Sequence, residues 1–216
     1  MNYETNILKR FSIVILMIAI MFFLAKNLFI TNYLSSISFI NADVVLFEKY
    51  LFQFIAGFIG LSILSRGQLW SYGINSSEFF VSAKYIIVYG LVGVATNYFR
   101  NETNLVFAKQ SDLAIHSFVF YVAIPISNIV FYIGLLQNYF EKDFAKHFSK
   151  YLFAATLLFI LVCFIVENIL IIGHELKYFE VIHSELVLVI SIFVYQKYKS
   201  ILIPLLGSVL SYLIVF

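Results

Sequence analysis

The sequence has few charged residues, little cysteine and little proline. Only 12% of its 216 residues are charged, about half the share found in soluble domains, which excludes an ordinary soluble globular protein. The formal net charge of +2 is too small and too dispersed for a nucleic-acid-binding surface. A single cysteine, Cys163, excludes a disulfide framework and a cysteine-rich metal site.

Apolar and aromatic residues take the place of the missing charge. Hydrophobic residues make up 62% of the chain and aromatic residues 19%, as is typical of proteins with lipid-facing surfaces and aromatic belts at the bilayer interfaces. No linker, repeat or low-complexity tract divides the sequence. We therefore expect an all-α, polytopic transmembrane helix bundle that forms a single integral membrane domain over residues 1–216. We expect it in the plasma membrane of a prokaryote.

Apolar runs and charge placement predict the topology. About seven spans are expected, at residues 11–29, 45–64, 82–99, 113–140, 151–173, 185–196 and 201–216. The first run is long enough to cross a bilayer, so we interpret it as a retained helix rather than a cleaved signal. The sixth run is short, and His183 is expected in the loop before it. With the N-terminus inside, nine lysines and arginines lie on inner segments and five on outer ones, as the positive-inside rule requires.

Three segments in the second half of the chain share a polar-in-apolar pattern. They are IPISNIVFYIGLLQNY at 124–139, TLLFILVC at 156–163 and SILIPLLGSVLSYLI at 200–214. In order and spacing these segments resemble the motifs EExxxR, FxxxH and HxxxN or HxxxD of the CPBP family, the CAAX-type and bacteriocin-processing glutamic intramembrane proteases. The resemblance covers a protease-like core at about residues 113–216. The positions that match the motifs are Ser127, Asn128, Tyr132, Phe159, Cys163, Ser208 and Tyr212.

The resemblance implies a protease fold without its chemistry. Ser127 and Asn128 stand where the family has glutamates, and Tyr132 stands where it has arginine. Cys163 and Ser208 replace the two histidines. None of these side chains provides a carboxylate general base or a fixed positive charge at neutral pH. We therefore expect a pseudoenzyme with no cofactor, which acts in the bilayer as a subunit, scaffold or immunity-type partner of another membrane protein.

Other interpretations remain open at this stage. Ser127 and Asn128 serve equally well as helix-packing residues that hydrogen-bond to neighbouring helices or to backbone carbonyls near Pro125. An active intramembrane protease with non-standard residues would draw on His116, Glu167 or His174. These residues lack HExxH spacing, so no metal site is expected. A small transporter or channel subunit would place residues 125–128 near the bilayer midplane.

Overall fold

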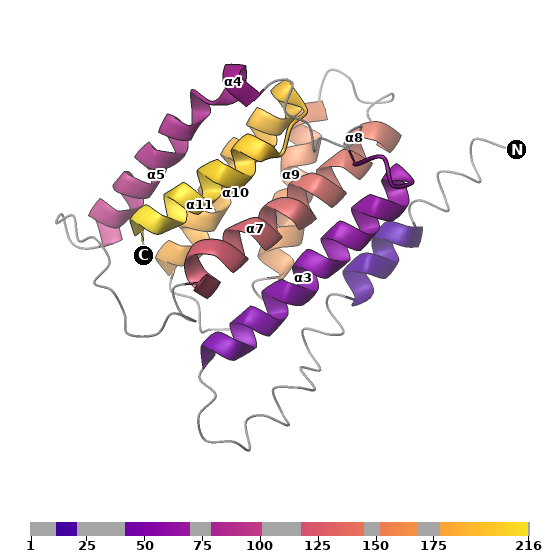
Figure 1. The fold of residues 1–216 in the computed structure, drawn as a ribbon, viewed down its shortest axis with the longest axis horizontal. Coiled ribbons are helices and arrows are strands. Elements are labelled where there is room, and N and C mark those ends of the chain that lie inside the picture. The colour runs from indigo at the N-terminus through magenta and orange to yellow at the C-terminus, as the bar shows by residue number, and fades with distance from the viewer. Residues whose placement is uncertain are drawn as a thin grey trace, which may run out of the picture.

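The fold is built from helices that pack side by side (Figure 1). A computed structural model describes residues 12–20, 42–69, 79–100, 118–144, 152–167 and 178–215. Every regular element in these ranges is a helix. The predicted all-α class is therefore confirmed for the described part of the chain.

The helices follow the apolar runs of the sequence. Residues 12–20 are helical, and the structure continues through six further helical segments. They are α3 (Ala42–Ser65); α4 (Phe79–Ser82) with α5 (Tyr85–Arg100); the continuous run of η2 (Val119–Ala123), α7 (Ile124–Asn128), η3 (Ile129–Gln137) and α8 (Asn138–Phe144); α9 (Leu152–Glu167); α10 (Tyr178–Tyr198); and α11 (Leu202–Val215). These seven helical segments of the described ranges overlap the seven predicted spans.

Several of these helices have the length and hydropathy of membrane spans. Three described helices are long and apolar enough to cross a bilayer, namely Phe79–Arg100, Tyr121–Glu141 and Val181–Tyr198. Shorter apolar helices lie at Lys49–Ser65, Ala154–Ile165 and Leu202–Val215. The orientation of the bundle, the number of crossings and the single-domain organisation stay predictions.

The sixth predicted span was placed too late in the sequence. Helix α10 begins at Tyr178 instead of near residue 185 and is 21 residues long. His183, which was expected in the preceding loop, lies inside this helix and is 0% exposed. A hydropathy pattern misses the first two turns of α10 because they contain the polar residues Glu180, His183, Ser184 and Glu185. The helix accommodates His183 and Ser184 by packing these side chains against other helices.

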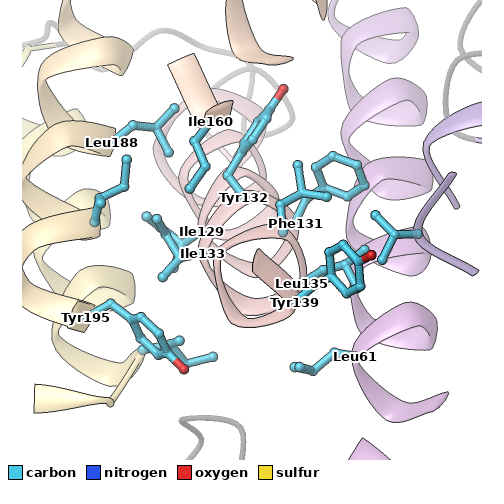
Figure 2. Packing of buried hydrophobic residues seen from close by; sticks show 14 of the residues in the cluster. Leu61, Ile129, Phe131, Tyr132, Ile133, Leu135, Tyr139, Ile160, Leu188 and Tyr195 are labelled. Carbon is cyan, nitrogen blue, oxygen red and sulfur yellow. The ribbon is translucent and has the colours of Figure 1, made fainter. Parts of the chain in front are cut away.

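The run from η2 to α8 is the central helix of the bundle. All nine residues of η3, Ile129–Gln137, are buried, which is the pattern of a helix enclosed on every side. Figure 2 shows Leu61 of α3 beyond one flank of this helix and Leu188 of α10 beyond the other. The segments η2 and η3 are π-helices on either side of the turn that contains Pro125. Such wider turns help to satisfy backbone groups that a proline displaces.

Glycines allow the helices to approach closely. A Cβ atom on Gly57 of α3 would lie 3.0 Å from the Phe131 Cα of η3, and one on Gly93 of α5 would lie 2.8 Å from the Ser211 carbonyl oxygen of α11. Both contacts are with backbone, which cannot move aside as a side chain can. Small residues at helix contacts are the usual means of close packing in membranes.

Candidate functional site

Ser127 forms a hydrogen bond within its own helix, and Asn128 forms one with a neighbouring helix. The Ser127 hydroxyl donates to the Ile124 carbonyl oxygen of its own helix at 3.0 Å. The Asn128 Oδ1 accepts from Gln53 Nε2 of α3 at 3.2 Å. Lys49, one turn before Gln53, is only 3% exposed. Asn128, the second residue of the motif pair, therefore contacts a buried polar residue of α3.

Tyr132 and the positions on α9 are surrounded by aromatic and aliphatic side chains. The Tyr132 ring is buried and meets the Phe164 ring edge to face, with centroids 5.6 Å apart. Phe159 stacks on Phe140 at 5.3 Å. Cys163 is half-buried and packs against the same apolar cluster as Tyr132. At the arginine position and the first histidine position, the side chains thus contribute to a hydrophobic core.

The third motif lies on α11 and splits between two environments. The buried Ser208 hydroxyl donates to the Leu205 carbonyl oxygen of its own helix at 3.0 Å. Tyr212 is buried, and its hydroxyl forms a hydrogen bond with the Ser184 hydroxyl of α10. Tyr212 packs in a different apolar cluster from the one that holds Tyr132. The described partners of Asn128, Tyr132 and Tyr212 therefore lie on three different helices, α3, α9 and α10.

The weaker candidates contribute little to a described site. His116 and His174 lie outside the described residues. Glu167 is the last residue of α9, and its side chain is not among those described. Within the described ranges, no three histidine, cysteine or acidic residues gather in a metal-binding arrangement.

The clearest polar centre surrounds His183, which sequence reasoning placed in a loop. Its Nδ1 lies 3.2 Å from the Thr96 hydroxyl of α5, and its Nε2 lies 3.4 Å from the Ser211 hydroxyl of α11. The imidazole ring also meets the Tyr212 ring edge to face, with centroids 4.8 Å apart. Three helices therefore converge on one buried imidazole.

Further polar contacts extend this His183 centre along the same helices. Further along α10 from His183, the Ser191 hydroxyl lies 2.8 Å from the buried Tyr89 hydroxyl of α5. Near the C-terminal end of α5, Asn97 Nδ2 donates to the Ile214 carbonyl oxygen at 2.5 Å, and Arg100 donates to the Val215 carbonyl oxygen at 3.0 Å. The last carbonyls of a helix lack partners within that helix. Asparagine and arginine of α5 therefore cap the end of α11.

The chemistry of the His183 centre is that of a satisfied neutral imidazole. A neutral ring offers one donor and one acceptor, and a hydroxyl can take either role. Thr96 and Ser211 therefore meet both ring nitrogens without any charge. The sequence signals that could have located this centre are His183 and Thr96 inside otherwise apolar helices, since polar groups in membrane segments usually face the bundle interior.

A second polar group lies where the central helix meets the end of α10. Gln137 Nε2 donates to Glu141 at 2.7 Å and to the Ile192 carbonyl oxygen at 3.1 Å. The Tyr195 hydroxyl donates to Asn138, and Lys199 forms an ion pair with Glu141. Glu141 is 7% exposed and Lys199 54% exposed. These contacts join the C-terminal part of the central helix to the end of α10 and to the connection between α10 and α11.

Comparisons with known proteins give no relative for this chain. No family model matches the sequence, no curated protein is similar to it, and no solved structure is similar to its fold. The resemblance to the CPBP proteases therefore stays a prediction from the sequence motifs.

Proposed function

We propose that this chain is a non-catalytic integral membrane protein of the CPBP-like type, which acts by holding or stabilising another membrane protein. The proposal is supported most directly by the surroundings of the motif positions. Ser127 and Ser208 bond to carbonyls of their own helices, and Asn128 bonds to Gln53. The two serine hydroxyls are thus taken up within their own helices, and the Asn128 bond joins the central helix to α3.

The apolar faces of the bundle agree with this role. Large hydrophobic side chains on the outward face of α5 are exposed, including Ile87, Leu91 and Phe99, which are more than half exposed. A soluble monomer rarely exposes contiguous apolar surface of this kind, whereas lipid or a partner helix covers it readily. We further propose that the bundle lies in the plasma membrane of a prokaryote with its N-terminus inside.

Site-specific crosslinking tests the proposed partner role. A photoreactive amino acid placed at Leu91, which is 63% exposed, reports on neighbours in the membrane. The matched control is Tyr89 on the same helix, which is 0% exposed. We expect one adduct of fixed mass from one or more outward positions such as Leu91 and none from Tyr89. A scan of all outward faces that yields only lipid adducts would contradict the role.

A second candidate function is an active intramembrane hydrolase with non-standard residues. One observation favours it, because Ser211 and His183 Nε2 are 3.4 Å apart, near the reach that a nucleophile and its base require. Both side chains are 0% exposed, so neither meets water in this arrangement. A fluorophosphonate probe that labels the wild type but not Ser211→Ala would favour the hydrolase. Absence of labelling in native membranes favours the non-catalytic role.

A further inference from the structure

Two lysines from distant parts of the chain meet at one end of the bundle. Lys84 directly precedes α5, and its Nζ lies 5.8 Å from the centre of the Tyr85 ring. Lys197, in the last turn of α10, has its Nζ 5.9 Å from the same centre and 3.4 Å from the Tyr85 hydroxyl. It also lies 5.4 Å from the centre of the Tyr198 ring. We name Lys84, Tyr85, Lys197 and Tyr198 the lysine–tyrosine cluster.

The positive charge of this cluster has no described counter-charge. Lys84 and Lys197 are both exposed. In the ranges that the structure describes, neither is part of an ion pair, while the nearby Lys199 is paired with Glu141. Two ammonium groups drawn to one aromatic ring repel each other, so an anion between them would be stabilised. The cluster therefore has the charge of an anion site.

The side chains around the cluster indicate which kind of anion would bind there. The short helix α4 precedes Lys84 and carries Phe80, which is 88% exposed, and Val81, which is 56% exposed. Helix α4 lies at the same end of the bundle as the start of α11, which it contacts (Figure 1). Exposed apolar side chains next to lysine and tyrosine are characteristic of the level at which acyl chains meet headgroups.

We propose that the lysine–tyrosine cluster binds the phosphate of an anionic phospholipid headgroup. Lys84 and Lys197 provide the charge, and the Tyr85 hydroxyl provides a hydrogen bond. Phe80 and Val81 contact the acyl chains of the same leaflet. This inference rests on the proposal that the chain is an integral membrane protein. It adds a specific lipid to that proposal, at the helix ends that the charge pattern predicts to be cytoplasmic.

Lipid binding to the purified full-length chain tests the site. A fluorescent phosphatidylglycerol is titrated into the protein in mild detergent, with phosphatidylcholine of the same chain length as the neutral comparison. A lysine near a membrane surface contributes roughly fivefold to binding of anionic lipid. We therefore expect Lys197→Gln to weaken phosphatidylglycerol binding about fivefold, and the double variant Lys84→Gln/Lys197→Gln about 25-fold.

Matched variants separate the site from general charge effects. Arg66→Gln removes one exposed positive charge at the end of α3 and should leave binding within about twofold. Lys84→Arg/Lys197→Arg keeps both charges and should retain binding. The comparison of the two lipids on the wild-type chain does not depend on whether the glutamine variants fold. Inorganic phosphate at the lipid concentration should not displace the lipid, because it lacks acyl chains.

Three results would overturn the lipid site. They are equal wild-type affinity for both lipids, an Arg66→Gln effect as large as that of Lys197→Gln, or displacement by inorganic phosphate, which would indicate a soluble anion as the ligand. Alkaline carbonate washing of membranes distinguishes this failure from failure of the underlying proposal. A chain that stays in the membrane without selecting phosphatidylglycerol removes only the lipid site. A chain that carbonate releases contradicts the integral membrane assignment itself.

Discussion

Replacing Gly207 with alanine tests the closest approach found at any glycine in the described ranges. A Cβ atom at this position of α11 would lie 2.2, 2.5 and 2.7 Å from three atoms of the Tyr89 ring. Tyr89 is fully buried, and its hydroxyl bonds to Ser191 at 2.8 Å, so the ring cannot move aside without losing that bond. Overpacking costs roughly 1–3 kcal/mol, and the hydrogen bond adds about 1 kcal/mol. We expect Gly207→Ala to lower the free energy of unfolding by about 2–4 kcal/mol.

Gly90→Ala is the matched control for this substitution. A Cβ atom on Gly90 of α5 would meet only Leu210 and Ile214 side chains, at 3.9 and 4.0 Å. Both variants gain the same helix propensity, up to about 1 kcal/mol, so their difference isolates the clash. Thermal unfolding in detergent should show Gly207→Ala about 5–12 °C below Gly90→Ala. Equal midpoints would refute the close contact between α5 and α11.

Two further polar contacts give predictions of smaller size. Asn128→Ala should cost about 1 kcal/mol of unfolding free energy, and in a double-mutant cycle with Gln53→Ala the two losses should sum to more than the loss of the double variant. Additive losses would show that the hydrogen bond contributes nothing. Glu141→Gln removes the charge that pairs with Lys199 and should cost about 1 kcal/mol at low salt. Salt screens this partly exposed pair, so the difference in unfolding free energy between Glu141→Gln and the wild type should shrink at about 0.5 M salt. A constant difference would indicate that charge is not the cause.

Apolar run length predicted where the helices are, because hydropathy is a local property. The helices α3, α5, α9 and α11 each overlap a predicted span. The start of α10 was missed because its first turns contain His183 and Ser184, which lower local hydropathy. Their partners Thr96 and Tyr212 lie 87 and 28 residues away in sequence. Contacts at such separations come from the packing of whole helices and leave no mark on a local pattern.

The sequence indicates candidate positions more readily than the roles of the residues at those positions. The polar residues Ser127 and Asn128 stand out in an apolar segment, but a serine inside a helix looks the same whether it binds a ligand or its own backbone. Which of these happens depends on what faces it, and Gln53 faces Asn128 from α3. His183 matches no motif position of the family, so the resemblance carries no information about this residue. The signal that marks it in the sequence is a polar residue among apolar ones, because such residues usually face the interior of a membrane bundle.

Water access at Ser127 and Ser208 tests most directly whether the interior around the motif positions is packed and non-catalytic. Ser127→Cys and Ser208→Cys, each in a Cys163→Ser background, are treated in native membranes with a water-soluble maleimide, which reacts only with hydrated thiolates. Both parent serines are buried, at 1% and 0% exposure, whereas Arg66→Cys at an exposed helix end serves as the reactive control. We expect rapid labelling of the control and none at the two motif positions. Labelling of Ser127→Cys and Ser208→Cys at a rate near the control would reveal a water-filled cleft and contradict the packed, non-catalytic interior.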